Sequence, residues 1–173
     1  VGHPALEKTA QESEDAQKLA MMRQTFGSPR EIVVLFLDPI GDRKNIVGYD
    51  EIDVVNYSID ALMKTKNRPL LVVKCHPRTD VNKIKSVIDD SRDVFVVEPH
   101  LEIDSFDLMR LSDKILGMTS IMLVHGLVLG KPVLSIQLNP TDRGRKRSNF
   151  YLDKILCKDS DQLQGFLSSG HAV

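Results

Sequence analysis

The segment from Lys114 to Gln137 constrains the fold of this chain more than any other. A short apolar run ends at Gly117, two hydroxyl residues, Thr119 and Ser120, precede an apolar stretch closed by Gly130, and a second apolar run follows. This order predicts strand, turn, helix, turn and strand. Glycine lets backbone approach a ligand, and the N–H groups of a first helical turn have no partner inside the helix and lie at the positive end of its dipole. The segment therefore predicts an anion-binding site, and phosphate is the expected ligand.

Apolar runs alternate with helical patterns along the rest of the chain. Continuous Val, Leu, Ile and Phe runs of this kind are typical of strands covered on both faces. Helices are expected between them, with Asp50 and Asp80 as capping residues. The alternation predicts an α/β fold, a Rossmann-like three-layer sandwich with a parallel sheet of about six strands in the order 3-2-1-4-5-6. We expect strands at 32–37, 70–75, 94–97, 114–117, 133–137 and 155–157.

The length of 173 residues predicts one compact unit with a substantial core. Residues 1–30 are expected to form a connector and an N-terminal helix, since a polar, helix-prone stretch from 5 to 26 is followed by Gly27, Ser28 and Pro29. Residues 31–173 are expected to form the Rossmann-like domain.

Charge and cysteine content restrict the partners and the compartment. The 23 Lys and Arg residues nearly cancel the 24 Asp and Glu residues, so no overall field favours nucleic acid or an anionic membrane. Cys75 and Cys157 lie in apolar runs where reduced thiols are expected, which favours a cytoplasmic location. No apolar run approaches the ~20 residues of a transmembrane helix. Because the chain starts at Val1 without a signal-peptide pattern, we expect a fragment.

Several polar residues follow predicted strands and should meet at one edge of the sheet. In the expected order the sheet reverses between the first and fourth strands, and ligands bind beyond the strand ends at that point. Those ends are the turn from Asp38 to Gly41 and the turn from Gly117 to Ser120. His76 and Arg78, in the His-Pro-Arg turn after the second strand, share this edge.

Each candidate has a structural alternative. Histidine can donate to phosphate or carry a proton, and the arginine fork suits phosphate or carboxylate, but the same turn could simply end a strand. Thr119 and Ser120 could serve only as N-caps, worth ~1 kcal/mol. His125, on an otherwise apolar helix, fits a hydrogen-bonded core residue better than a ligand.

Further polar residues near this edge are weaker candidates. Glu98 and His100 follow the third strand, and Arg143 belongs to a basic cluster at 143–147 that could meet an anion or form a solvated loop. The scattered histidines and thiols lack metal-ligand spacing, so no metal and no cofactor are expected. Dinucleotide, Walker and nucleophile-elbow motifs are also missing. No residue is assigned as catalytic.

Three stretches together resemble a known family: Gly-His-Pro-Ala-Leu at 2–6, Val-Val-Lys-Cys-His-Pro-Arg at 72–78, and the segment 111–137. They are similar to the C-terminal half of GT-B glycosyltransferases and of the related non-hydrolysing UDP-N-acetylglucosamine 2-epimerases. The His-Pro turn is also similar to that of bacterial sialyl-, polysialyl- and glycerophosphate transferases. The resemblance covers nearly the whole chain and is most specific at 111–137.

The resemblance implies a domain that binds the nucleotide of an activated sugar, such as a UDP- or CMP-sugar. It implies that His76, Thr119 and Ser120 hold the donor phosphates without a metal, and that residues 98–101 lie near the base. Where the family commonly carries Glu-Ala, the glutamate touching the ribose, this chain has His125 and Gly126. A histidine could still bind a ribose hydroxyl.

The resemblance also implies a missing N-terminal half, which in the family holds the acceptor and the catalytic base. The start at 2–4 resembles the connector between the halves, so we expect an excised C-terminal domain or half-enzyme that is inactive alone. The favoured function is donor binding for a glycosyltransferase acting on a glycan or lipid-linked acceptor. An epimerase-like half and a degenerate, non-catalytic binding module remain alternatives, and a homo-oligomer stays open.

Overall fold

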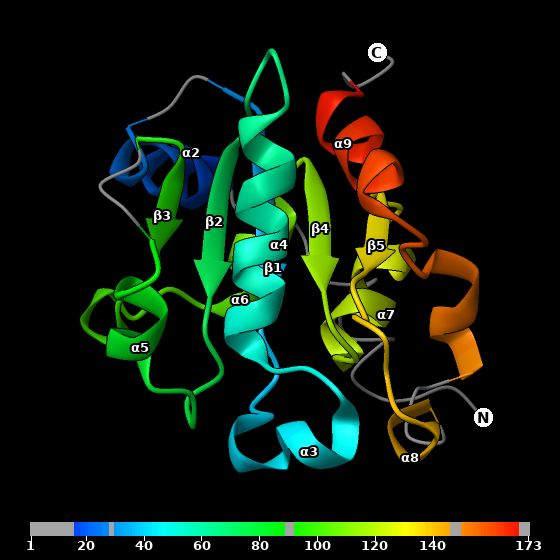
Figure 1. Ribbon diagram of the computed structural model, residues 1–173. Coiled ribbons are helices and arrows are strands. Elements are labelled where there is room, and N and C mark those ends of the chain that lie inside the picture. The colour runs from blue at the N-terminus through cyan, green and yellow to red at the C-terminus, as the bar shows by residue number, and fades with distance from the viewer. Residues whose placement is uncertain (1–15, 28–29, 89–91, 146–149, 170–173) are drawn as a thin grey trace, which may run out of the picture.

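Five short apolar runs form a parallel sheet in the order β3-β2-β1-β4-β5 (Figure 1). The computed structural model describes residues 16–27, 30–88, 92–145 and 150–169. Each residue of the central strand β1 is buried, as its continuous Ile-Val-Val-Leu-Phe sequence predicts. The strands are β1 (Ile32–Phe36), β2 (Leu70–Lys74), β3 (Val94–Val96), β4 (Lys114–Gly117) and β5 (Val133–Ser135).

The order confirms the predicted reversal between β1 and β4. Val34 pairs with Val72 of β2 on one side and with Ile115 of β4 on the other. All pairings are parallel, so the carboxyl ends of the strands share one edge, at the bottom of Figure 1. This edge is called the carboxyl rim below.

The sixth predicted strand, at 155–157, is wrong. An isolated parallel bridge joins Leu156 to Ser135, and the Cys157 N–H donates to the Ser135 carbonyl at 2.7 Å. The 3-10 helix η3 (Phe150–Ile155) ends immediately before this bridge, and Asp159 already caps the next helix. One residue is left for pairing, so the sheet has five strands in the described part of the chain.

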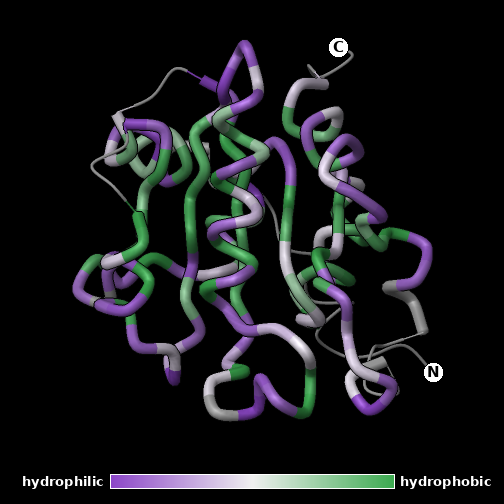
Figure 2. The backbone as a smooth tube through the Cα atoms, in the orientation of Figure 1, coloured by the Kyte–Doolittle hydropathy of each residue, from purple (hydrophilic) through white to green (hydrophobic). Residues whose placement is uncertain are grey.

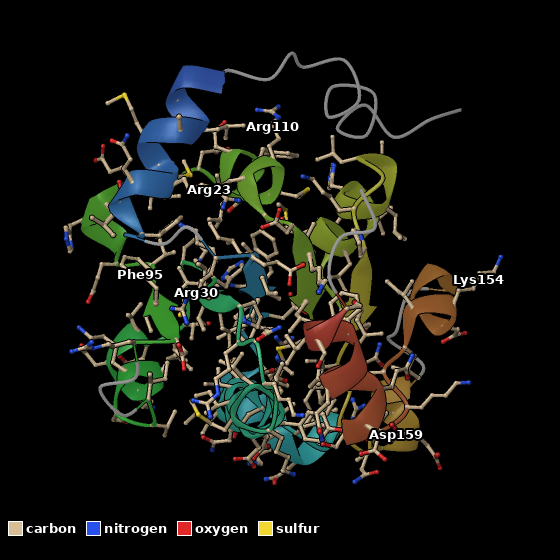
Figure 3. The ribbon with its side chains drawn as sticks, turned by 90° about the horizontal axis from the view of Figure 1, so that it is seen from above. Arg23, Arg30, Phe95, Arg110, Lys154 and Asp159 are labelled. Atoms are coloured by element: carbon tan, nitrogen blue, oxygen red, sulfur yellow. The ribbon has the colours of Figure 1, made fainter. Side chains whose placement is uncertain are left out.

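Helices cover both faces of the sheet and complete the predicted three layers (Figure 3). On one face α4 (Glu51–Met63), α5 (Val81–Lys85) and α9 (Ser160–Ser168) enclose one apolar cluster with the side chains of Val33, Leu35 and Leu71. On the other, α2 (Ala16–Thr25), α6 (Ser105–Leu111) and α7 (Ile121–Val128) enclose a second cluster with Ile32 and Val34. Figure 2 shows the resulting hydrophobic strands between helices of mixed character.

The predicted caps explain where several helices begin. Asp50 starts α4 in a reciprocal capping box with Asp53, and Asp80 accepts from the Asn82 N–H at the start of α5. Of the predicted pair Thr119 and Ser120, Ser120 caps α7 through its hydroxyl, and Asp104, which was not predicted, caps α6. A cap is a local contact between a side chain and its own helix, which is why the sequence predicts Asp50, Asp80 and Ser120.

Short helices at the carboxyl rim were not predicted. They are η1 (Gly41–Arg43), α3 (Lys44–Val47), η2 (Pro99–Leu101) and α8 (Asp142–Arg145). Of the predicted N-terminal helix, residues 5–26, the structure describes α2; the Gly-His-Pro-Ala-Leu motif at 2–6, Lys146 and Arg147 lie outside the described residues. Among the helices of the described ranges, none combines the length and apolar character that a membrane crossing needs.

Candidate functional site

A cleft of about 910 Å³ opens at the carboxyl rim where the sheet order reverses. It lies at the ends of β1, β2 and β4, which is where ligands bind in open parallel α/β sheets. Its lining includes 36–39 after β1, 74–79 after β2, 119–122 at the start of α7, and 102–105 before α6, together with Arg43, Val81 and Val97. Four separate segments of the chain therefore meet here.

The His76–Arg78 turn lines the cleft, as its position after β2 predicts. The turn is closed by a hydrogen bond from the Thr79 N–H to the His76 carbonyl at 2.8 Å. The Arg78 N–H donates to His76 Nδ1 at 3.1 Å, so a neutral His76 carries its proton on Nε2. This bond orients the imidazole and leaves Nε2–H as a donor. The Arg78 side chain is exposed.

The start of α7 supplies backbone donors to the same cleft. The Ser120 hydroxyl accepts from the Met122 N–H at 3.2 Å, so Ser120 is the N-cap. Within the described ranges, the N–H groups of Ser120 and Ile121 have no hydrogen-bond partner. Both residues line the cleft, and their amides lie at the positive end of the helix dipole.

Gly117 has a packing role instead of a place in the cleft lining. A Cβ at this position would lie 2.8 Å from Leu123 Cδ2 and 3.2 Å from the Phe36 carbonyl oxygen. The glycine lets the end of β4 pass close to β1 and to α7. It therefore shapes the turn that carries Thr119 and Ser120. The sequence also predicts that Gly117 lets the backbone come close to a ligand, and that role stays a prediction.

Asp38 is the main cleft residue that the sequence analysis did not single out. Its carboxylate Oδ2 accepts from the Thr119 N–H at 2.6 Å and from the Thr119 hydroxyl at 2.8 Å. Thr119, predicted to bind phosphate, is thus engaged by a protein carboxylate. Burial, together with the charge on Asp38, raises the pKa of the nearby Tyr49 phenol. The available signal was position, because Asp38 is the first polar residue after β1 at the reversal.

The turn that carries Asp38 is fixed from α4. The buried Glu51 carboxylate accepts from the Ile40 N–H at 2.9 Å and from the Gly41 N–H at 3.1 Å. Gly41, a lower-ranked site prediction, therefore has its N–H bound within the protein, and it is not among the residues that line the cleft. Its φ of +48° is one that glycine adopts without strain.

Other polar groups in the cleft are held by backbone carbonyls. Lys74 Nζ donates to the Ile103 carbonyl at 2.9 Å, and burial lowers the pKa of this lysine. Arg43 donates to the carbonyls of Pro39 and Ile40.

Burial raises the pKa of the Cys75 thiol to about 11, so Cys75 is protonated near neutral pH and a poor nucleophile.

His125 lies in the core, away from the cleft lining. It is buried on α7, and its ring meets the Phe106 ring edge-on at a centroid distance of 5.0 Å. This placement matches the structural alternative for His125 rather than a ribose contact.

The three remaining candidates lie elsewhere on the rim. Glu98 forms an ion pair with Lys85 that holds the pKa of its carboxyl below the usual range. His100 and Arg143 are exposed on η2 and α8. None of the three lines the cleft. Across the described residues, no cluster of three His, Cys, Asp or Glu side chains could hold a metal ion.

The parallel sheet, its reversal and the cleft at that point define a Rossmann-like domain. No protein-family model matches the sequence, and none of the curated proteins compared with it matches significantly. The fold is similar to that of solved structures, described next, which are GT-B glycosyltransferases and epimerase-like proteins.

One solved structure is the UDP-GlcNAc 2-epimerase of Methanocaldococcus jannaschii with UDP-GlcNAc and UDP. The match covers 96% of this chain and 46% of the epimerase, with a TM-score of 0.61 and 18% sequence identity. The match to MnaA of S. aureus, solved with UDP, covers 92% of this chain and 40% of MnaA, with a TM-score of 0.56 and 14% sequence identity. The match to a variant of the wall teichoic acid polymerase TagF with CDPG covers 96% of this chain and 42% of TagF, with a TM-score of 0.51 and 14% sequence identity. The chain has the fold of one half of such GT-B proteins and spans less than half of their length.

Proposed function

We propose that this chain is the nucleotide-sugar binding half of a GT-B glycosyltransferase that acts on a glycan or lipid-linked acceptor. One observation carries the proposal: the cleft at the sheet reversal brings the open amides of α7 together with the His76–Arg78 turn. Amides at a helix start, a histidine N–H and an arginine are donors suited to phosphate. The fold similarity to proteins solved with UDP supports the same assignment.

In the proposed complex a nucleotide phosphoryl group lies at the Ser120 and Ile121 amides. His76 Nε2–H and the Arg78 guanidinium donate to it from the facing turn. These groups stabilise the charge that develops on the departing nucleotide, because fixed donors need no reorganisation when the glycosidic bond to the phosphate breaks. The base extends toward residues 102–105, the cleft segment that follows the turn at 98–101. The acceptor and the catalytic base come from a second domain, since the chain spans less than half of the proteins it resembles in fold.

A second candidate function is a degenerate binding module that keeps the fold without binding nucleotide. The Asp38 carboxylate on Thr119 favours it, because it places a negative charge beside the proposed phosphate site. The buried position of His125 points the same way, since the ribose contact expected there is lost.

Calorimetric titration of the full chain with UDP, CMP and GDP separates the two candidates. We expect at least one nucleotide to bind, and His76→Ala to weaken that binding about tenfold or more, because a hydrogen bond to a charged group is lost. His100→Ala is the matched control, as His100 is an exposed histidine on the same rim outside the cleft. If no nucleotide binds, or if both variants weaken binding equally, the donor-binding assignment fails.

A further inference from the structure

The positive and negative side chains that line the cleft are equal in number, so the cleft has no excess positive charge for an anionic ligand. Three cations line it, Arg43, Lys74 and Arg78, and so do three carboxylates, Asp38, Glu102 and Asp104. Arg43 and Lys74 already donate to backbone carbonyls. In the part of the chain that the structure describes, Arg78 is the one cleft cation whose side chain has no partner. The Arg78 guanidinium and the His76 imidazole are therefore the side chains left to bind the ligand.

The backbone donors are limited in the same way. Three consecutive N–H groups begin the turn into α7, at Thr119, Ser120 and Ile121. Asp38 takes the first of them and also the Thr119 hydroxyl, and the Asp38 N–H is itself engaged with Met118 Sδ at 3.3 Å. Two amides remain. A carboxylate in this position repels any further negative charge that approaches the helix start.

We propose that Asp38 makes the cleft a site for a single phosphoryl group, so that it takes a sugar nucleotide built on a nucleoside monophosphate in preference to one built on a diphosphate. This inference rests on the proposed function and adds the substrate class. A phosphodiester with one negative charge matches two amides, one arginine and one histidine. The second phosphoryl group of a diphosphate, one bridging oxygen away, adds charge beside Asp38, while the other two cleft cations, Arg43 and Lys74, already donate to backbone carbonyls.

Asp38 acts here as a specificity-determining residue, and the structure fixes it for that role. The Thr119 bonds hold its carboxylate from the α7 side. From the α4 side, Glu51 holds the Ile40 and Gly41 amides two and three residues further along the chain. A residue held from both sides is expected to keep its position when ligand arrives.

The test compares monophosphates with diphosphates of the same base, namely CMP with CDP, UMP with UDP and GMP with GDP, by calorimetry on the full chain. In the wild-type protein we expect the monophosphate of the preferred base to bind about tenfold more tightly than its diphosphate. Asp38→Asn keeps an acceptor for Thr119 and removes the charge, so the preference should fall about tenfold, chiefly through tighter diphosphate binding.

Glu102→Gln is the matched control, because it removes another cleft carboxylate, one from the segment before α6, whereas Asp38 is hydrogen-bonded to Thr119 at the start of α7. It should change both affinities alike and leave their ratio intact. Equal or tighter diphosphate binding by the wild type would overturn the inference while leaving nucleotide binding in place, and so would an equal change of ratio in both variants. If no nucleotide binds, the proposed function fails as well. Should Asp38→Asn fail to fold, the wild-type ratio alone decides.

Discussion

Glu51 stabilises the turn at residues 38–41 from within the first turn of α4. Its side chain is buried, and its carboxylate accepts from the Gly41 N–H at the start of η1 and from the Ile40 N–H, which also donates to the Asp38 carbonyl at 3.0 Å. A buried N–H without an acceptor costs ~1–3 kcal/mol. Glu51 therefore belongs to the support of the site even though it does not line the cleft.

Replacing Glu51 should destabilise the protein in proportion to the acceptors lost. We expect Glu51→Ala to lower the free energy of unfolding by about 2–4 kcal/mol, and Glu51→Gln, which keeps one acceptor oxygen, to lower it by about half as much. Urea unfolding measures both. Asp60→Asn, an exposed acid on the same helix, should stay within about 0.5 kcal/mol. A Glu51→Ala loss no larger than that of Asp60→Asn would contradict the supporting role.

The sequence predicted the local contacts of such residues and missed the distant ones. Asp50 and Asp80 were identifiable as caps because the side chain binds its own helix a few positions away. Asp38 and Thr119 are 81 positions apart, and their hydrogen bonds depend on how two turns face each other across the rim. Strand alternation brings both turns to one edge, but it does not say which donor meets which acceptor.

At the scale of elements, two short helices at the carboxyl rim fit closely together. The Thr141 N–H donates to the Val47 carbonyl at 2.9 Å, which joins the end of α3 to the segment before α8. A Cβ on Gly144 would lie 2.6 Å from the same Val47 oxygen. Backbone passes backbone here, so the contact needs a residue without a side chain. This pair of helices fixes the part of the rim that follows Arg43.

Adding a methyl group at Gly144 should separate the two helices. We expect Gly144→Ala to lower the unfolding free energy by about 1–3 kcal/mol, because the obstructing atoms are backbone and cannot rotate away. Gly165→Ala in α9 is the matched control, since a Cβ there meets nothing within 4 Å. Alanine's higher helix propensity should make that variant up to ~1 kcal/mol more stable. Thermal unfolding of both variants checks the opposite signs, and a shared sign would refute the packing argument.

The sequence predicts whether a segment forms a helix or a strand where its apolar pattern is long. It does not where contacts with distant segments determine the structure. The five strands and the helices α4, α6, α7 and α9 follow from continuous runs and caps. The basic cluster at 143–147 was expected either to meet an anion or to form a solvated loop, yet Asp142–Arg145 forms the short helix α8, which packs against α3. The sixth strand failed for a similar reason, since between η3 and the Asp159 cap only Leu156 forms a bridge to Ser135.

At the scale of the whole molecule, the two edges of the sheet differ in chemistry more than in shape. A second cleft of about 880 Å³ lies at the opposite edge, close in volume to the cleft at the carboxyl rim, and it includes Lys64 and Lys66. Its other charges are paired: Asp93 with Arg30 and Arg68, and Glu31 with Lys114. It also lies past the last residue of α4, where the helix dipole disfavours an anion.

Only the cleft at the carboxyl rim should therefore bind nucleotide phosphate, although lysines are present at both edges. We expect Arg78→Gln to weaken binding of the preferred nucleotide about tenfold, since a charge-assisted hydrogen bond to phosphate is lost. Lys66→Gln removes one positive charge at the other edge and should leave the affinity unchanged, because an exposed charge that distant is screened at physiological salt. Calorimetry at two salt concentrations measures both. Equal losses that vanish together at high salt would mean that the nucleotide is attracted by surface charge alone, with no defined site at the rim.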